Sequence, residues 1–466
     1  MAFSNLEEFV ASTDDLVAAL RNSQIGAYVY PVVAPEFSNW RDEQMAWRET
    51  AVLFDQSHHM AELLVEGPEA LKLLSGLGVN SFDNFGVNRA KHFVACNHDG
   101  RVIGDVILFH FDTGHYNLVG RVPTVNWVEY NATTGDYDVM VSRDDRSPSR
   151  PGGKPVVRRH YRFQIQGPNA MSVLEELNGA PVPDIPFFRC DKISLAGRKV
   201  DALRHGMAGV PGLEVWGAYE QYDEVREAIL AAGEPFGLVP VGARAYATNT
   251  LESGWIPSPL PAVYTGESMK EYRQWLPGAG YEATASIGGS FIGSRIEDYY
   301  LTPYQLGYGF YVKFDHEFIG ADALRDMSDL PHRRKVTLEW NPEDVGRVLT
   351  SIFEPPGENN KIIDLPLSNY AAASYDSVVH EGRNVGFSMF AGYSANERAM
   401  LSLGVVDPEF VDGDILTLVW GEEGGGTTKT TVERHKQTEI RVKVAPVPYS
   451  EAARESYSPG WRTASV

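Results

Sequence analysis

The residues best suited to chemistry lie in one stretch, residues 237–261, with the sequence GLVPVGARAYATNTLESGWIPSPLP. A short β-like run ends at Gly242, and a polar segment that contains Tyr246 and Glu252 follows it. Trp255 and three prolines close the stretch, so a phenol, a carboxylate and an indole lie close together on stiff backbone. This arrangement predicts one wall of a ligand cavity. The alternative is a helix start followed by a rigid loop.

Polar side chains also gather where two other predicted strands end. The run AVLFD gives way to Gln56, His58 and His59, and the run YNLVG ends before Arg121. Neighbouring residues on an extended chain point to opposite sides, so the two histidines cannot readily bind one metal ion. We expect one histidine inside the cavity, one outside it, and no metal site. Arg121 is either a cation for an anionic ligand or half of a surface ion pair.

Two tyrosines and a glutamate each leave two interpretations open. Tyr28 and Tyr30 alternate with Val29, and in a strand they would share one face. That face could line a ligand or cap the edge of a core. Glu214 lies in the strand-like run GLEVW, where alternation places its side chain in solvent unless a donor-rich ligand holds it inward.

The composition limits the classes of partner. The 466 residues contain 41 Lys and Arg against 62 Asp and Glu, a net charge of −21, so the overall field repels nucleic acid and anionic membranes. A small anionic ligand would need a cation inside its cavity. No apolar run reaches the length of a membrane span, and the acidic N-terminus is unlike a secretory signal, so we expect a cytoplasmic protein. The sequence does not indicate an oligomeric state.

Several common chemistries lack their motifs. Cys96 and Cys190 are far apart and form no CxxC or Cys/His spacing, which argues against disulfides and structural zinc. The sequence contains no GxSxG, P-loop, HExxH, or GxGxxG after a strand. The remaining aromatic, amide, histidine, arginine and glutamate side chains suit a flat, partly anionic organic ligand.

Periodicity predicts a mixed α and β chain that ends in an all-β part. Helical patterns cover residues 5–21, 66–76, 167–177 and 220–233, and strand patterns cover residues 51–60, 91–110, 116–121, 161–165 and 192–203. Residues 143–155 form a predicted long loop, and residues 265–293 a predicted mobile connector. From residue 332 onward strand patterns dominate. The fold class is therefore α+β.

Six motifs in order resemble the folate-dependent aminomethyltransferases, the T-protein family of the glycine cleavage system. They are AVLFDQSHHMAELLVEGPEALKLL, RFQIQGPNAMSVL, HGMAGVPGLEVWG, GARAYATNTLESG, LTPYQLGYGFYVKFDHEFIGADAL and VGFSMFAGYSANERAMLSLGVV. Within that family, SQIGAYVYPVVAPEFSNW and LESGWIPSPLPAVYTGE are most similar to the bacterial tetrahydrofolate-dependent aryl O-demethylases of lignin breakdown. Those enzymes act on vanillate, 3-O-methylgallate and syringate.

The resemblance implies a T-protein-like cloverleaf of three domains. Residues 1–330 would form two interleaved α+β domains that bind folate and substrate, residues 331–450 a C-terminal β-barrel, and residues 451–466 a tail. The cofactor would be tetrahydrofolate, and the reaction would move a methyl group from a methoxylated hydroxybenzoate to N5 of the pterin. The alternatives are an aminomethyltransferase or dimethylglycine-type enzyme of the same fold, and a non-catalytic folate-binding regulator.

The resemblance also suggests roles for single residues. We hypothesise that Tyr246 contacts the ether oxygen or the neighbouring hydroxyl as acid or hydrogen-bond donor, and that His59 assists it. Arg121 would bind the benzoate carboxylate through its planar guanidinium. Glu252 would be structural. The substrate-lining residues would be Tyr28, Tyr30, Gln56 and Trp255, and the cofactor-binding residues would be Glu214, Gln166 and Trp255.

One position departs from the family pattern. T-proteins have two adjacent acids in the return strand of a hairpin, and this chain has Gly104 followed by Asp105 there. We therefore expect methyl transfer from an ether rather than aminomethyl chemistry.

Overall fold

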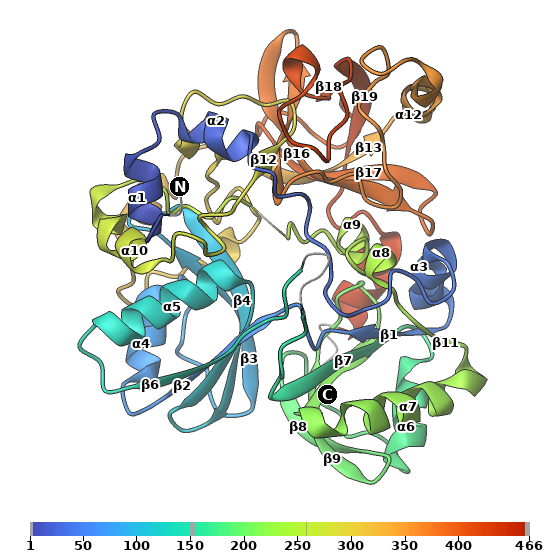
Figure 1. Ribbon diagram of the computed structural model, residues 1–466. Coiled ribbons are helices and arrows are strands. Elements are labelled where there is room, and N and C mark those ends of the chain that lie inside the picture. The colour runs from blue at the N-terminus through green and yellow to red at the C-terminus, as the bar shows by residue number, and fades with distance from the viewer. Residues whose placement is uncertain (1–2, 150–153, 258, 462–466) are drawn as a thin grey trace.

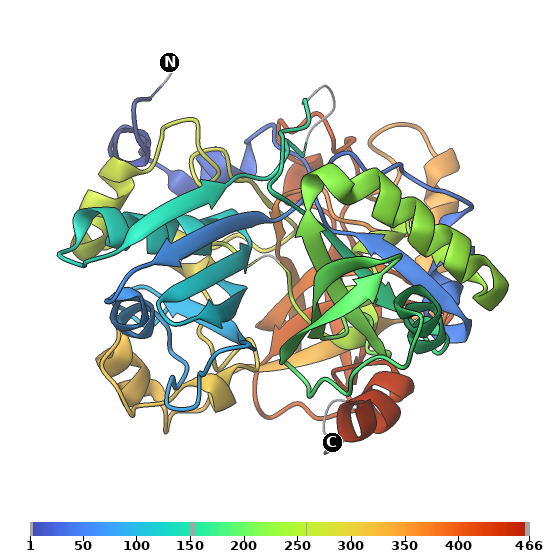
Figure 2. The same ribbon diagram turned by 90° about the horizontal axis from the view of Figure 1, so that it is seen from below.

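Three β-sheet units meet around a common centre. The computed structural model describes residues 3–149, 154–257 and 259–461. A five-stranded and a six-stranded sheet lie side by side in the lower half of Figure 1, and a closed barrel of six strands lies above them. Figure 2 shows the two open sheets side by side again from below. The expected α+β architecture with a C-terminal barrel is therefore present.

The six-stranded sheet has the strand order β11-β1-β7-β10-β9-β8, in which β1 runs parallel to β11 and antiparallel to β7. Its strands are β1 (Ala51–Asp55), β7 (His160–Gln166), β8 (Cys190–Leu195), β9 (Arg198–Arg204), β10 (Gly212–Ala218) and β11 (Leu238–Pro240). The apolar sides of α6 (Ala170–Asn178) and α7 (Tyr222–Gly233) pack on one face of this sheet. α3 (Trp40–Glu49) packs against β1 through Trp47 and Phe54.

The five-stranded sheet is antiparallel throughout, with the order β3-β4-β5-β2-β6. Its strands are β2 (Ala61–Glu66), β3 (Arg89–Cys96), β4 (Val102–Asp112), β5 (His115–Gly120) and β6 (Met140–Asp144). It shares its core with α4 (Ala70–Leu77) and α5 (Val122–Thr134). Because β1 belongs to one sheet and β2 to β6 belong to the other, the chain crosses between the sheets twice.

Two predictions made from the sequence are wrong, one for residues 5–21 and one for residues 265–293. The predicted helix 5–21 is two helices, α1 (Leu6–Ala11) and α2 (Leu16–Arg21), because Asp15 accepts a hydrogen bond from the Ala18 N–H and starts a new helix. The predicted mobile connector 265–293 is packed instead. It contains α10 (Lys270–Trp275), which contacts α1, and its Tyr272 is buried. The apolar runs in this segment are short and separated by glycines, so its hydrophobic periodicity did not indicate a packed structure.

The C-terminal unit is a barrel with the strand order β13-β17-β16-β15-β18-β19, closed by pairing of β19 with β13. Its strands are β13 (Arg334–Trp340), β15 (Asp376–His380), β16 (Arg383–Ser394), β17 (Ala399–Val406), β18 (Ile415–Trp420) and β19 (Thr438–Ala445). Other elements outside the barrel wall include β12 (Ile287–Gly288), β14 (Ala373–Ser374), α11 (Ala321–Met327) and α12 (Pro342–Thr350). All barrel strands fall within the range 331–450.

Residues 237–261 run from the six-stranded sheet to the barrel. After β11 they form α8 (Ala243–Tyr246) and α9 (Asn249–Ser253), and α9 packs on β16 and β17. Glu252 on α9 is fully buried, and its carboxylate accepts hydrogen bonds from Arg48 Nη2 at 2.8 Å and Ser394 Oγ at 2.7 Å. Since Arg48 lies on α3 and Ser394 ends β16, Glu252 joins three elements and has the structural position that the sequence suggested.

We expect Glu252→Ala to lower the free energy of unfolding by about 3 kcal/mol, because it leaves buried donors without their acceptor. Thermal and denaturant unfolding measure the change. The control is Glu227→Ala, on the exposed side of α7, which should shift stability by less than about 0.5 kcal/mol. Equal stability of the two variants would contradict the joining role of Glu252.

Candidate active site

A cavity of about 400 Å³ lies where the two open sheets meet α8 and α9. Its wall includes the turn after β1, parts of β4 and β5, and the loop after β9. The chain end also contributes, because the helical segment η8 (Ala452–Trp461) places Ala453 and Tyr457 in the wall. The predicted tail is therefore partly a structural element of the site.

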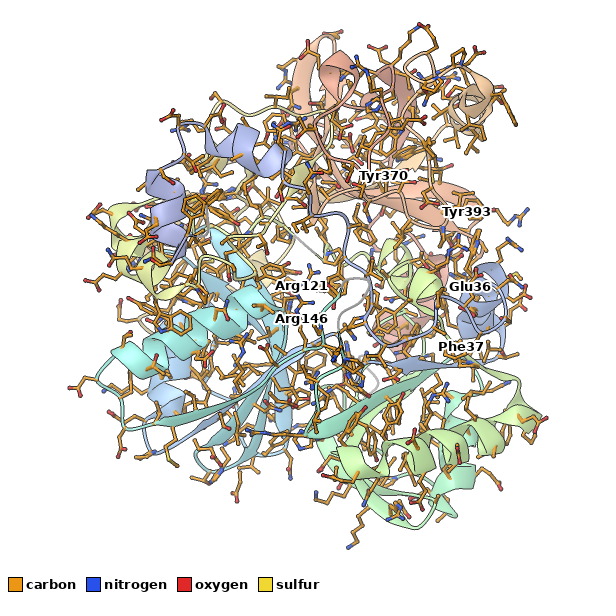
Figure 3. All side chains as sticks on the ribbon, in the orientation of Figure 1. Glu36, Phe37, Arg121, Arg146, Tyr370 and Tyr393 are labelled. Carbon is orange, nitrogen blue, oxygen red and sulfur yellow. The ribbon has the colours of Figure 1, made fainter. Side chains whose placement is uncertain are left out.

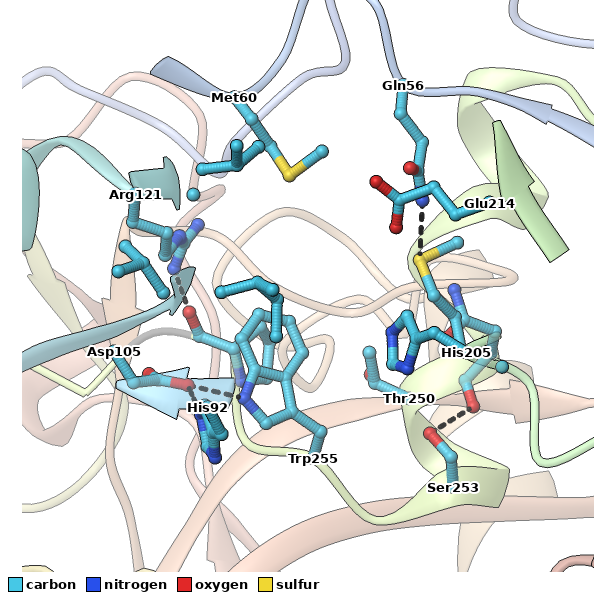
Figure 4. A pocket seen from close by; sticks show the side chains of 18 of the residues that line it. Gln56, Met60, His92, Asp105, Arg121, His205, Glu214, Thr250, Ser253 and Trp255 are labelled. Atoms are coloured by element: carbon cyan, nitrogen blue, oxygen red, sulfur yellow. Dashed lines mark hydrogen bonds and ion pairs between the residues drawn. The ribbon is translucent and has the colours of Figure 1, made fainter. Parts of the chain in front are cut away.

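The cavity has two chemically different sides. One side combines arginine with an indole and a carboxylate, and the other combines a glutamate with an amide and an imidazole. Figure 4 shows Arg121, Asp105 and Trp255 on the first side and Glu214, Gln56 and His205 on the second.

Four aromatic rings form a continuous wall, made of Tyr28, Tyr30, His59 and Tyr246. The ring centroid of Tyr246 lies 4.1 Å from that of Tyr30 and 5.0 Å from that of His59. The Tyr246 hydroxyl lies 3.3 Å from His59 Nε2, within hydrogen-bond distance. The sequence therefore identified a phenol and an imidazole that the fold brings together.

The strand expected for Tyr28 and Tyr30 is absent. Residues 22–39 are irregular, because Pro31 has no N–H to donate to a sheet and Val32 adopts a φ of 70°. Both rings still reach the cavity, with their centroids 5.3 Å apart. The Tyr28 hydroxyl donates to the His59 carbonyl oxygen at 2.9 Å, which ties this segment to the turn after β1.

Burial sets the protonation of the phenol and imidazole pair. Burial, with the nearby Tyr30, raises the pKa of Tyr246 well above its usual value. Burial, with the positive charges of Arg121 and Arg158, lowers the pKa of His59 to about 3. At neutral pH the pair is therefore a protonated tyrosine and a neutral imidazole.

His58 lies outside the cavity, as expected from the alternation of side chains. Its Nδ1 lies 2.8 Å from Ser147 Oγ and its Nε2 lies 2.8 Å from the Tyr219 hydroxyl. Both ring nitrogens therefore have protein partners, and the role of His58 is to fix the surrounding loops.

Glu214 faces inward and is only 5 % exposed, so its solvent-exposed alternative is excluded. Its Oε1 lies 2.5 Å from Arg162 Nη1, and Arg162 Nη2 lies 3.3 Å from Glu62 Oε1. Burial raises the pKa of Glu214, and the charge of Arg162 offsets only part of this effect. For Glu62, the charges of Arg162 and His160 outweigh burial and lower the pKa.

Two arginines bring positive charge to the opposite side of the cavity. Arg121 directly follows β5, and its Nη1 donates to the Pro257 carbonyl oxygen. Its guanidinium carbon lies 5.7 Å from the ring centroid of Tyr28, and that of Arg146 lies 5.3 Å from the same centroid. Figure 3 labels both arginines in the central region between the three units. Sequence reasoning missed Arg146, because it lies in the charged run RDDRSPSR, which is typical of a surface loop.

Trp255 is held by a carboxylate on the same side. Its indole Nε1 donates to Asp105 Oδ2 at 3.0 Å, and His92 Nε2 lies 2.5 Å from the same oxygen. Burial raises the pKa of Asp105, but His92 and Trp255 outweigh burial and lower it. The orientation of the indole is therefore fixed before any ligand binds.

Gly104, the departure from the family pattern, points away from the cavity. A Cβ at this position would lie 2.5 Å from Thr124 Oγ1 on α5, whereas Asp105 lines the cavity. An acid at position 104 would not reach the ligand. Gly104 therefore gives no structural reason to prefer methyl transfer over aminomethyl transfer.

Gln166 lies behind the cavity wall. Its Oε1 accepts hydrogen bonds from the backbone N–H groups of Met207 at 3.2 Å and Ala208 at 3.1 Å. Met207 lines the cavity, so Gln166 supports the loop that carries this residue. A direct contact between Gln166 and a cofactor stays a prediction, and its position favours a supporting role.

Comparisons with known proteins bear on this geometry. A family model described as "GCVT N-terminal domain" matches residues 23–258, just over half of the chain. The chain belongs to this family. The resemblance to the T-protein family that six motifs carried is therefore confirmed.

Two relatives match nearly full length. The chain is 49 % identical to syringate O-demethylase of Sphingobium sp. (strain NBRC 103272 / SYK-6) over 460 residues, which cover 98 % of this chain and 99 % of that one. It is 31 % identical to sesamin methylene transferase of Sinomonas sp. (strain No.22) over 437 residues, 90 % of this chain and 91 % of that one.

The fold has a solved counterpart in the glycine cleavage system aminomethyltransferase T from Bartonella henselae. The two share 17 % identity with a TM-score of 0.60, over 93 % of this chain and 95 % of that one. This likeness confirms the predicted T-protein-like fold.

The described residues give three further observations. None of their helices has the length and apolar character to cross a bilayer. No three of their His, Cys, Asp or Glu side chains are grouped so that they could hold a metal ion. Cys96 and Cys190 are both unpaired.

We expect the His59 imidazole to remain neutral at pH 5, where a histidine with the ordinary pKa of about 6.5 is mostly charged. Its lowered pKa means that the unfolded state gains a proton first as pH falls, so His59 reduces stability progressively below about pH 6.5. Nitrogen-15 NMR of labelled histidine rings measures the titration, and His59→Gln assigns the signal. A His59 titration midpoint between pH 6 and 7 would contradict this account.

Proposed function

We propose that this protein is an O-demethylase that transfers the methyl group of a methoxylated hydroxybenzoate, such as syringate, to tetrahydrofolate. The products are 5-methyltetrahydrofolate and a catechol-type acid. The relative named syringate O-demethylase, 49 % identical over almost the whole of both chains, supports this assignment. The observation that carries it is the protonated Tyr246 paired with neutral His59 in a cavity that has arginines on one side and Glu214 on the other.

The cavity wall fits a reduced pterin. Gln56 Oε1 and His59 Nδ1 are buried and have no hydrogen-bond partner among the described residues, although buried polar atoms are normally paired. Glu214 offers an acceptor-only carboxylate, which suits the adjacent N–H groups of a 2-aminopterin. Glu214 would hold that edge, and Trp255, on the side of the arginines, would pack beside the aromatic ring of the substrate. When bound, tetrahydrofolate supplies the secondary amine that receives the methyl group.

The side chains act on the oxygen that the methyl group leaves. An aryl methyl ether is unreactive because its leaving group is a poorly stabilised phenolate, so catalysis requires a donor where negative charge develops. Tyr246 keeps its proton at neutral pH and can donate a hydrogen bond to this oxygen, which would take up the proton that N5 of tetrahydrofolate loses on methylation. His59, 3.3 Å away, orients the Tyr246 hydroxyl. Arg121 binds the carboxylate and so fixes the direction of the aromatic ring.

We also propose a cytoplasmic location and no nucleic-acid partner. The two unpaired cysteines suit a reducing compartment, and the net charge of −21 opposes binding to phosphate backbones.

The reaction is tested with purified protein, tetrahydrofolate and, separately, syringate, vanillate and 3-O-methylgallate. We expect one methoxy group to be lost for each 5-methyltetrahydrofolate formed, and no turnover without folate. The panel identifies the preferred substrate. Folate binding without demethylation would contradict the proposal and favour an aminomethyltransferase or a folate-binding regulator.

We expect Tyr246→Phe to lower kcat by about 10²- to 10⁴-fold, because the ring contacts remain while the proton donor is lost. Binding of the methoxybenzoate should persist, as measured by titration. The control is Tyr304→Phe, which removes a hydroxyl that bonds to the Leu324 carbonyl oxygen outside the cavity. Unchanged kcat in Tyr246→Phe would remove Tyr246 from the chemistry.

We expect Glu214→Gln to weaken tetrahydrofolate binding by at least about tenfold, since a charge-assisted hydrogen bond is lost. Fluorescence titration with tetrahydrofolate measures the dissociation constant. Glu62→Gln is a matched control, because Glu62 also pairs with Arg162 but does not line the cavity. If both variants lost folate binding equally, the effect would come from Arg162 and not from direct contact by Glu214.

A further inference from the structure

Arg146 lines the cavity without an anionic partner. Two buried arginines elsewhere are paired, Arg158 with Asp144 at 3.1 Å and Arg162 with Glu214 at 2.5 Å, whereas Arg146 is in the cavity lining. Arg146 forms no ion pair within the described ranges, and its Nη1 is buried there without any hydrogen-bond partner. The residues outside those ranges include no Asp or Glu. In a chain with 62 acidic residues, this unpaired cation marks a place for an anion of the ligand.

The backbone that carries Arg146 is held in place. The neighbouring Ser147 donates its N–H to the His58 carbonyl oxygen at 2.9 Å, and its Oγ lies 2.8 Å from His58 Nδ1. The same Oγ accepts the Val156 N–H at 3.0 Å. The guanidinium of Arg146 also lies 5.7 Å from the ring centroid of Tyr281, which covers it. These contacts hold the backbone next to Arg146, whose side chain lines the cavity.

Arg146 and Arg121 share one neighbour, the ring of Tyr28. Both guanidinium groups are positively charged, so an anion bound beside Tyr28 would be attracted by both. Arg121 already donates a hydrogen bond from Nη1 to the Pro257 carbonyl oxygen, so only part of its guanidinium is available to bind a carboxylate. A carboxylate accepts up to about four hydrogen bonds, and the unpaired Nη1 of Arg146 can donate to oxygen lone pairs that Arg121 leaves unbound.

The geometry points to Arg146 as a second carboxylate-binding residue, which acts with Arg121 on the carboxylate of the aromatic substrate. This inference rests on the proposed function. The glutamate carboxylates of folate share the same chemistry. The aromatic acid is the better match, because Tyr28 continues through Tyr30 to Tyr246, where the methoxy group would react.

The test measures binding of syringate to the folate-free protein by calorimetric titration, with 2,6-dimethoxyphenol as the same ring without a carboxylate. We expect Arg146→Gln to weaken syringate binding by at least about tenfold and to leave the phenol unaffected. Arg146→Lys should recover part of the lost affinity, since it keeps the positive charge but not the planar pair of N–H donors. Lys154→Gln removes one exposed positive charge from the same segment and should bind syringate as the unchanged protein does.

The outcomes separate the inference from the function on which it rests. Equal loss of both ligands in Arg146→Gln would indicate a distorted cavity and overturn the inference. Weakened tetrahydrofolate binding with unchanged syringate binding would also overturn it and assign Arg146 to the folate carboxylates. If the unchanged protein bound syringate through Arg146 yet transferred no methyl group, the carboxylate site would stand and the proposed reaction would fail.

Discussion

Arg162 lies between two buried carboxylates, and the rest of the site depends on this arrangement. Glu62 comes from β2 of the five-stranded sheet, whereas Arg162 and Glu214 come from the neighbouring strands β7 and β10 of the six-stranded sheet. The ion pairs therefore join the two sheets where they enclose the cavity. The guanidinium also lies 4.9 Å from the ring centroid of Trp216, and Arg162 is only 1 % exposed. Because a buried charge without its partner is costly, the three groups hold one another in place.

This constraint gives the cavity its electrical polarity. Arg162 forms ion pairs with both Glu62 and Glu214. On this side of the cavity, the carboxylate of Glu214 is the hydrogen-bond acceptor that faces a ligand. Arg121 and Arg146 carry positive charge on the other side, with no acidic side chain of the described residues in an ion pair with either. A donor-rich pterin and an anionic benzoate would thus be drawn to opposite sides. Tyr246 lies on the aromatic wall between these two sides, where the methyl group would pass from the ether oxygen to the pterin.

Several residues of the cavity wall were predictable from the sequence, whereas contacts between distant segments were not. Tyr246 was identified in a short stretch that also contains a carboxylate and an indole, and Glu214 was identified through the family motif, because alternation alone placed its side chain in solvent. The fold brings both residues to one cavity. Arg146 was missed because its direction depends on contacts between Ser147 and His58, which are 89 residues apart in the chain. Hydrophobic periodicity along the sequence does not indicate these contacts between Ser147 and His58. The family motifs predicted the three-unit architecture, whereas the packing of residues 265–293 arose from contacts that no local pattern contains.

In the proposed complex, charge fixes the orientation of both ligands in one cavity. A crystal structure with a tetrahydrofolate analogue and a methoxybenzoate tests it most directly. The account predicts the 2-amino edge of the pterin on Glu214, the carboxylate of the benzoate between Arg121 and Arg146, and the methoxy oxygen within hydrogen-bond distance of the Tyr246 hydroxyl. A benzoate carboxylate turned toward Glu214, or a pterin seated against the two arginines, would contradict it.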